Sequence, residues 1–529
     1  MTRKIDRRTF GKGTAGLLLG GTFLGGARSV RAQYAAPAEG GMRGGKLTVG
    51  SIVEPPALDP FHQGADARIQ VTVLMYQGLM FEDASGTAKP LLAESHELSE
   101  DGLTYTFRLR RNAVFHGGRP MTAADVKYSY DYVRNPENGS PGAGDYATIE
   151  EITVLDDHTV QMRLSEPNAA LLMTLTNKYG GVVPEGYFDD QAARARMNQQ
   201  SVGTGPYMLA QFQPNSFLTL KRNPDYWNES SGLLDEITFV YLPNAASMLV
   251  ALRSGRVDMA VLSRPQDAAQ LEDAANLEIR RFPSFNQKSI DLDLAYEPLA
   301  PLEVRQAIAL AVDKTKLMQA AIGGFGTVIG TMPAGMQEGW GAPVDELPNQ
   351  GPDLARAKEL MAKAGHGGGL ELTLTTIIGY DWMDPAAVTL AEQLKPIGID
   401  LQINKVDLGV WINNFRSRKM GFTFNDWGSQ PDPSLLFYRH FHKQPEGADF
   451  RNWNDGPGSE LLDKGRQESD PAKRRAIYVD FQKRLAEQVP TIMMFSSDHV
   501  VVSSRKVKNY RHHPTGWYFG LADAWVEQA

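Results

Sequence analysis

The sequence predicts an α/β fold with mixed sheets, arranged as two lobes that are joined by a hinge. A chain of 529 residues is long enough for two or three lobes with cores of their own. Between residues 370 and 406, a strand, a helix and a second strand follow one another, which is the order of an α/β unit. The residue pattern changes near residue 300 and again near 495. We therefore expect a discontinuous first lobe that recovers the tail, with two connections to the second lobe forming the hinge.

Alternating and capped segments predict the elements of the first half. Its beginning contains an expected strand, an expected turn-rich segment and an expected helix: Lys46–Ile52, Glu54–Pro60 and Val71–Leu79. Thr104–Arg110 alternates residue type, as a strand with one buried face does. After a Gly-Gly turn, Thr122 can cap a helix that carries Val126 and Tyr130 one turn apart. Asp125 falls in the first turn of this helix, where negative charge suits the helix dipole.

The second half alternates helical and strand-like segments. Val304, Ile308 and Val312 recur at a four-residue spacing, which predicts a helix from about Leu302. A further helix should begin at Asp470-Pro471, turn Ile477, Phe481 and Leu485 inward, and end at Pro490. The other expected elements are a helix Asp353–Ala364 stopped by Gly365, a strand Leu370–Thr376, a helix Ala386–Leu394, a strand Ile399–Val406 and a strand Val500–Ser503.

The N-terminal segment has the features of an export signal peptide. Asp6–Lys12 resembles a twin-arginine signal, and a mildly apolar, glycine-rich segment follows it. Val30-Arg31-Ala32 offers small side chains for cleavage, so residues 1–32 are expected to be removed and residues 33–45 to form a flexible lead-in. Gly11–Gly16 also matches the GxGxxG motif of dinucleotide-binding proteins, but no strand precedes it, so we do not expect a nucleotide site there. We expect a periplasmic protein.

Composition narrows the class of function. The chain carries a formal charge of −8, and its first 32 residues are basic, so the mature part is strongly acidic and unsuited to nucleic acid. There is no cysteine, which excludes disulfides, iron–sulfur clusters, zinc thiolates and a cysteine nucleophile. It also excludes the lipidated cysteine by which Gram-positive receptors are anchored. No phosphate loop, catalytic triad or HExxH motif is present, so we expect neither an enzyme nor a cofactor.

A series of short landmarks resembles the family 5 extracellular solute-binding proteins, which are the peptide, opine and nickel receptors of ABC importers. The strongest match is the block Asp101–Tyr130, and Pro298–Lys314 resembles the entry helix of the family's second lobe. The other landmarks follow in the expected order: Leu58-Asp59-Pro60, Tyr76–Leu79, Leu92–Ser95, Gly203–Tyr207, Asn223–Trp227 and Gly255–Asp258. The resemblance implies a two-lobed periplasmic-binding-protein fold in three subdomains that closes on its ligand.

This resemblance and the changes in residue pattern together suggest domain limits. The first lobe would comprise residues 46–90 and 203–290, with an extra subdomain at 91–202. The second lobe would comprise residues 291–497, and residues 498–529 would return to the first lobe.

The segment Asn425–Pro433 resembles the loop that lines the cleft in this family. In dipeptide receptors, an aspartate three residues before the Asp-Pro pair binds the ligand's ammonium, but Ser429 occupies that position here. Asp426 could replace it only with a shifted backbone. The arginine that binds the ligand carboxylate in such receptors has no counterpart in Ile377–Trp382. Both differences count against a short zwitterionic peptide that is bound by its two ends.

The remaining candidates are aromatic and amide side chains, which suit a sugar, an opine or a longer peptide bound through its backbone. Core packing is the alternative role for the tryptophans. The expected ligand-binding residues are Trp382, Trp411, Asn425, Asp426, Trp427, Ser429 and Gln430, with Glu54 and Asn286 as weaker candidates.

Histidines offer a nickel-binding alternative. His440 and His442 would share one face of a strand and could bind a metal, but Arg439 and Lys443 would repel a dication, so we expect no metal site. His512-His513 is expected on a surface loop.

We therefore predict a monomeric periplasmic receptor that delivers an oligopeptide or peptide-like solute to an ABC permease, with ATP hydrolysed by a separate subunit. A sugar or opine receptor is the closest alternative. A secreted enzyme or a periplasmic chaperone would be an alternative of another class.

Overall fold

The computed structural model describes residues 41–62, 66–176, 179–190, 192–428, 430–443 and 451–528. The predicted signal peptide, most of the predicted lead-in and Ser429 lie outside these residues. No helix within these ranges combines the length and the apolar character that a membrane span requires.

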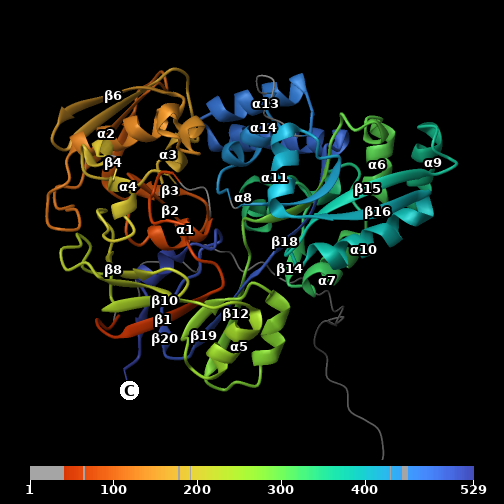
Figure 1. Cartoon of the computed structure of the whole chain (residues 1–529). Coiled ribbons are helices and arrows are strands. Elements are labelled where there is room, and N and C mark those ends of the chain that lie inside the picture. Colours follow the sequence, from red (N-terminus) through yellow and green to blue (C-terminus); the bar gives the residue numbers. More distant parts are fainter. Residues whose placement is uncertain are drawn as a thin grey trace, which may run out of the picture.

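The first lobe is built on a seven-stranded mixed sheet that draws on both ends of the chain (Figure 1). Its central strand β1 (Lys46–Ser51) is parallel to both neighbours, β10 and β11, while the outer pairs are antiparallel. The other strands are β8 (Tyr207–Gln213), β9 (Phe217–Arg222), β10 (Glu236–Tyr241), β11 (Met259–Val261), β12 (Leu277–Phe282) and β19 (His499–Ser504). The tail therefore contributes β19 to a sheet that the N-terminus begins.

A separate four-stranded antiparallel sheet lies beside this lobe, in the order β4–β5–β7–β6. Its strands are β4 (Ala93–Leu98), β5 (Thr104–Leu109), β6 (Ile149–Asp156) and β7 (Thr159–Leu164). Helix α2 (Ala123–Arg134) covers it, and Thr122 is the N-cap, as predicted. Asp125 is fully buried and accepts hydrogen bonds from the backbone N–H groups of Thr122 and Glu185. The N-cap sequence therefore also ties this helix to a distant loop.

The second lobe is built on a six-stranded mixed sheet, in the order β14–β18–β13–β17–β15–β16. Its strands are β13 (Gln287–Leu292), β14 (Gly326–Val328), β15 (Leu370–Ile377), β16 (Ile399–Val406), β17 (Phe422–Trp427) and β18 (Thr491–Ser497). Its helices include α6 (Leu302–Ala311), α7 (Lys314–Ile322), α9 (Leu354–Lys363), α10 (Met383–Leu394), α13 (Gly456–Gln467) and α14 (Pro471–Gln488). The sequence predicts six of these elements, and each lies within a few residues of its expected limits: β15, β16, α6, α9, α10 and α14.

Shorter elements connect these parts. The paired short strands are β2 (Met80–Glu82) with β3 (Ala88–Pro90), and β20 (Val507–Lys508) with β21 (Trp525–Val526). The remaining α-helices are α1 (Asp66–Thr72), α3 (Leu171–Thr174), α4 (Ala193–Arg196), α5 (Ala245–Arg253), α8 (Gln337–Trp340), α11 (Leu408–Ser417) and α12 (Arg439–Phe441). Helical turns include η3 (Ala143–Tyr146), η5 (Pro265–Leu271) and η10 (Ser434–Tyr438).

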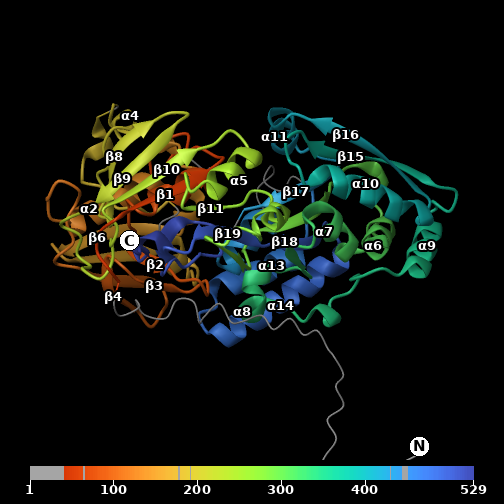
Figure 2. The ribbon, with the colours of Figure 1, turned by 90° about the horizontal axis from the view of Figure 1, so that it is seen from below.

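Two described segments pass between the large sheets, one from β12 to β13 and one from β18 to β19. Figure 2 labels β18 and β19, the two strands that the second segment joins. The two segments are held together by Asn286, whose Oδ1 accepts hydrogen bonds from the Ser497 N–H at 3.1 Å and the Ser497 hydroxyl at 3.2 Å. The tail joins them, because the Phe285 N–H donates to the Pro514 carbonyl at 3.0 Å.

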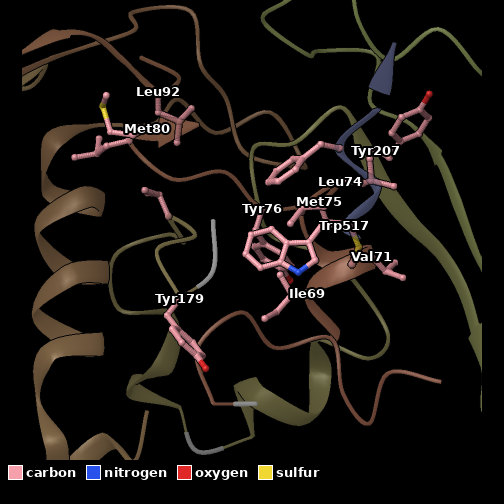
Figure 3. Close-up of a cluster of buried hydrophobic side chains, with 14 of the residues drawn as sticks. Ile69, Val71, Leu74, Met75, Tyr76, Met80, Leu92, Tyr179, Tyr207 and Trp517 are labelled. Atoms are coloured by element: carbon pink, nitrogen blue, oxygen red, sulfur yellow. The ribbon is translucent and has the colours of Figure 1, made fainter. Parts of the chain in front are cut away.

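The largest buried cluster lies in the N-terminal half and includes the end of the chain. Figure 3 shows Trp517, from the tail, packed among Ile69, Met75 and Tyr76. The first lobe therefore cannot complete its core without residues that follow the second lobe.

The predicted helix Val71–Leu79 is wrong beyond Thr72, where α1 ends. The next residues use their carbonyl groups for other segments: Gly205 N–H donates to Met75 at 2.9 Å and Val182 N–H donates to Gln77 at 2.8 Å. A Cβ on Gly78 would stand 2.5 Å from the Leu175 carbonyl oxygen, so backbone packs directly on backbone here. These tertiary bonds replace the helical ones.

Two smaller expectations also need correction. Ile477 is half-buried, while Arg474, Tyr478, Phe481 and Leu485 form the inward face of α14. His512 and His513 are 1% and 0% exposed rather than on the surface. Their side chains contact the segment that links the lobes, since the His512 ring packs on Phe282 and the His513 ring on Phe285.

Candidate ligand-binding cleft

The predicted ligand loop leaves the second sheet at an edge that faces the first lobe. Strands β15 and β17 are parallel, so their carboxyl ends lie at one edge, where antiparallel β13 begins. Ligands of α/β sheets bind outside the carboxyl ends of such strands. From the first lobe, Gly86 approaches the loop so closely that a Cβ there would stand 3.0 Å from the Pro431 carbonyl oxygen. The loop is therefore enclosed from the opposite lobe.

Asp426 is paired with Lys288, a cation that lies 138 residues earlier in the chain. The two residues are opposite each other on β17 and β13, with Nζ 2.5 Å from Oδ2. The lysine side chain is 8% exposed and the aspartate side chain 31%. Lys288 thus places at this edge a positive charge of the kind that the sequence of Ile377–Trp382 lacks.

Trp382 lies under the same ammonium group, with Nζ 5.6 Å from the centre of its ring. The ring packs against Phe424 and Phe495, and its buried Nε1 donates to no partner in the described part of the chain. Nearby Tyr380 has a raised pKa, mainly because it is buried and also because of the negative charge of Asp426. Lys288, Asp426 and Trp382 therefore form one charged and aromatic group at the edge.

Asn425 belongs to a buried polar network on the opposite face of the strand. Its Nδ2 donates to Asp291 Oδ2 at 2.8 Å. Asp291 also accepts a hydrogen bond from Thr491 at 2.6 Å and pairs with the fully buried Arg451 at 3.3 Å. The amide of Asn425 is therefore already committed within the lobe.

Trp427 lies in the core of the second lobe and is 4% exposed. Its Nε1 donates to the Ser289 hydroxyl at 2.7 Å. The Arg451 guanidinium lies 4.4 Å from the ring centre, and the rings of Phe441 and His440 pack at 5.7 Å and 4.1 Å. A solute could stack on this ring only after these contacts opened.

The other members of the predicted loop set are placed as follows. Trp411 is half-buried on α11, stacks on Phe415, and donates through Nε1 to the Thr423 hydroxyl at 3.1 Å. Gln430, which belongs to the loop, is buried, and Ser429 lies outside the described residues.

The two weaker candidates make hydrogen bonds outside the loop. Glu54 accepts a hydrogen bond from the Asn215 N–H at 2.7 Å, within the first lobe. Asn286 holds Ser497 where the chain passes between the lobes. Asn286 directly precedes Gln287, which pairs with Trp427 across β13 and β17, so Asn286 lies next to the loop. The side-chain hydrogen bond of Glu54, by contrast, stays within the first lobe.

A cavity of about 640 Å³ lies directly beyond this loop, between the four-stranded sheet and the second lobe. This volume falls within the usual range of roughly 300–1,000 Å³ for small-molecule sites. One wall comes from the first half of the chain and includes Pro141, Asp145, Thr148, Glu166 and Asn168. The other wall includes Phe415, Ser434, Tyr438, Arg439, His442 and Arg466.

Direct hydrogen bonds join the two walls at the rim of the cavity. The Ala169 N–H donates to the Arg466 carbonyl at 2.8 Å, and Gln467 Nε2 donates to Glu166 at 3.3 Å. Figure 1 shows α3 beside α13 and α14 in the same region. The cavity is thus enclosed by contact between parts that are some 300 residues apart, as the separation of 301 residues between Glu166 and Gln467 illustrates.

Sequence reasoning missed this cavity. Its second wall begins at Ser434, directly after the predicted loop, and this proximity was the one signal available. No spacing in the sequence links residues near 145 to residues near 440, because only the tertiary fold brings them together.

The histidine pair does not form a metal site. His440 and His442 lie at and just after α12 rather than on a strand. They diverge: the His440 ring packs on Trp427, while His442 stacks on Tyr438 and lies 3.1 Å from Asp463. No cluster of three or more potential metal-ligating His, Cys, Asp or Glu side chains occurs in the described ranges.

Comparisons with known proteins agree with this architecture. The family model described as bacterial extracellular solute-binding proteins, family 5, middle region, matches residues 87–448. A dipeptide-binding protein of Pseudomonas aeruginosa is 28% identical over 502 residues, covering 89% of this chain and 93% of that protein. The glutathione-binding protein GsiB of Escherichia coli is 26% identical and covers 88% and 92%.

Solved structures show the same fold. AgaA from A. tumefaciens R10, in complex with agropinic acid, is 27% identical with a TM-score of 0.79, covering 92% of this chain and 99% of that one. DppA from Helicobacter pylori, in complex with the peptide STSA, is 25% identical with a TM-score of 0.79 and the same coverage. The chain therefore belongs to the bacterial extracellular solute-binding proteins of family 5.

Proposed function

We propose that this chain is the periplasmic receptor of an ABC importer and that it captures an oligopeptide or peptide-like solute between its lobes. The observation that carries the proposal is the 640 Å³ cavity, which is walled by both halves of the chain and begins where the predicted ligand loop ends. The relatives that are named for dipeptides and glutathione, and the neighbour that holds the peptide STSA, support a peptide-like ligand.

The proposed domain limits stay close to those expected from the sequence. We place the first lobe at residues 46–90 and 203–286, the extra subdomain at 91–202, the second lobe at 287–497 and the returning tail at 498–529. The boundary that the sequence predicts at residue 290 moves to residue 286, because β13 (Gln287–Leu292) belongs to the second sheet. Closure of the lobes would enclose the solute, and the closed form would dock on a membrane permease. Binding without turnover is expected, with the chain acting as a monomer.

Export by the twin-arginine route belongs to the same proposal. Arg7 and Arg8 support it, with cleavage near Ala32. Replacing both arginines by lysine should leave the precursor in the cytoplasm.

Calorimetry with alanine peptides of two to five residues tests the ligand class. We expect saturable one-to-one binding, with the dipeptide weaker than the longer members. Absence of binding across the series would overturn the peptide class.

An opine is the second candidate, because AgaA binds agropinic acid and is 27% identical over nearly the whole chain. Agropinic acid is therefore titrated beside the peptides. Binding of agropinic acid alone would establish the opine class instead.

A further inference from the structure

The two walls of the cavity carry opposite charge. Arg439 and Arg466 lie on the wall from the second lobe, while Asp145 and Glu166 lie on the wall from the first half of the chain. Exposure of these groups is intermediate for all but Arg439, which is exposed. A solute between the walls therefore meets a cationic surface on one side and an anionic surface on the other.

The two arginines have no carboxylate partner among the described residues. The Arg466 guanidinium stacks on Tyr438, 4.5 Å from the ring centre, and no carboxylate of the described ranges comes within the 4.0 Å of an ion pair. Arg439 reaches only the carbonyl of Pro141 across the cavity, at 3.3 Å. Both guanidinium groups thus keep donors for an added anion.

The opposite wall carries two carboxylates with unused acceptor capacity. Asp145 makes no side-chain hydrogen bond or ion pair within the described ranges, and Glu166 accepts one hydrogen bond, from Gln467. Because a carboxylate can accept several hydrogen bonds, both groups retain capacity for an ammonium group.

At the edge of the second sheet near the loop, by contrast, the charges are already paired. Asp426 and Lys288 neutralise each other there at 2.5 Å. A solute that takes only one of these partners would leave the other charge partly buried and unpaired, which is costly. The cavity walls impose no such cost, since their charges are not paired across the space.

We propose that this cavity is a subsite for a solute with two opposite charges, with its carboxylate at Arg466 and Arg439 and its ammonium at Asp145 and Glu166. The inference rests on the proposed function and deepens it, because it names the residues that select the solute's ends. Tyr438 and Phe415 also line the cavity and provide an apolar surface for the middle of the solute.

The test uses the mature chain and the best-binding alanine peptide of two to five residues, with its N-acetylated and C-amidated forms. The free peptide should bind about tenfold to a hundredfold more tightly than either blocked form, as expected for a charge-assisted hydrogen bond. In Arg466→Gln, the preference for the free over the amidated peptide should become smaller, because only Arg439 remains for the carboxylate. In Asp145→Asn, the preference for the free over the acetylated peptide should become smaller, because only Glu166 remains for the ammonium group.

Two control variants distinguish the effect of a charge that lines the cavity from the effect of changing the net charge of the protein. Lys464→Gln removes a positive charge two residues from Arg466 on α13, at a position that does not line the cavity. Glu137→Gln removes an exposed acidic charge near the other wall. Both controls should keep the end-group preference of the unmodified protein.

The outcomes distinguish this inference from the proposed function. Tight peptide binding with unchanged end-group preference in both cavity variants would overturn the subsite and leave the peptide receptor intact. Absence of binding by every peptide would overturn the peptide function and the subsite together.

Discussion

The side chains around the cleft differ in how many of their hydrogen-bonding groups already have partners within the protein. Trp427 and Asn425 look equivalent to Asp426 in the sequence, yet both are committed to Ser289 and Asp291 within the lobe. Alternation along β17 explains this difference, because successive side chains point to opposite faces of the sheet. The loop therefore offers fewer free ligand groups than its composition suggests.

Replacing Trp427 by alanine tests its place in the core. Loss of a buried aromatic side chain should lower the free energy of unfolding by about 3–5 kcal/mol. Chemical denaturation measures the change, and Trp411→Ala, at a half-buried position, should cost less. Unchanged stability with a large loss of solute affinity would show that the ring serves the ligand instead.

The pairing of Lys288 with Asp426 should appear as coupling in stability. Asp426→Asn leaves the buried ammonium without its anion and should cost roughly 1–3 kcal/mol. Lys288→Met together with Asp426→Asn should cost less than the sum of the single changes, because the unpaired charge is then absent. Additive effects in the denaturation cycle would contradict this pairing.

These two cases show what the sequence allowed at the level of residues. The resemblance predicts where a ligand loop should lie, and core packing is the alternative role for the tryptophans, which Trp427 adopts. The partner of Asp426 was not, because it lies 138 residues away on a neighbouring strand. Likewise, the contact of Arg451 with Trp427 depends on tertiary packing.

At the level of elements, the local sequence pattern predicts the limits of a helix or strand where tertiary hydrogen bonds do not replace the regular ones. Strand β16 has the predicted limits, and α9 ends beside Gly365, whose φ of 85° is the left-handed conformation that favours glycine. The helix predicted after Thr72 is wrong, because carbonyl groups of this segment accept hydrogen bonds from Gly205 and Val182. No local pattern reveals these distant partners.

The tail loop carries histidines that face the segments between the lobes. His499 and His512 share a hydrogen bond of 2.8 Å between ring nitrogens. Burial lowers the pKa of His499 and of His513 to about 4, and it lowers the pKa of His512 well below its usual value. Positive charge on Lys288 further lowers the pKa of His499, positive charge on Arg280 further lowers that of His512, and negative charge on Asp83 acts in the opposite direction on His513.

These histidines should make stability fall with acid. In the unfolded chain they bind protons below about pH 6.5, whereas the buried rings resist protonation down to about pH 4. The free energy of unfolding should therefore be unaffected by them above pH 6.5 and decrease from there towards pH 4, by up to about 2 kcal/mol per histidine at pH 5. Denaturation curves at pH 7.5, 6 and 5 measure this dependence.

A substituted chain provides the control for the histidines. His499→Gln should make the free energy of unfolding fall less steeply between pH 6.5 and 4, because one of the three buried histidines is removed. His366→Gln, on the loop after α9, should leave the slope unchanged. An equal slope in all three proteins would assign the pH effect to other groups.

For the whole molecule, the decisive property is the contact between lobes across the cleft. The chain passes between the large sheets near residues 283–286 and again near Asp498, close to the positions where the residue pattern changes. The sequence thus indicated the path of the chain. It did not indicate which surfaces meet, because the contacts at Gly86 and at Ala169 depend on how the lobes dock.

Closure can be blocked at Gly86 without touching the ligand residues. A side chain there would meet the Pro431 carbonyl, whose oxygen lies 3.0 Å from the Cβ position. Gly139 has the same φ of 72° but nothing within 4 Å of its Cβ position, so Gly86→Val and Gly139→Val share backbone strain and differ in the interlobe contact. With saturating alanine peptide, small-angle scattering should show the unmodified protein and Gly139→Val becoming more compact, while Gly86→Val keeps its unliganded radius of gyration. Equal compaction in both variants, or no compaction of the unmodified protein, would rule out closure at this contact.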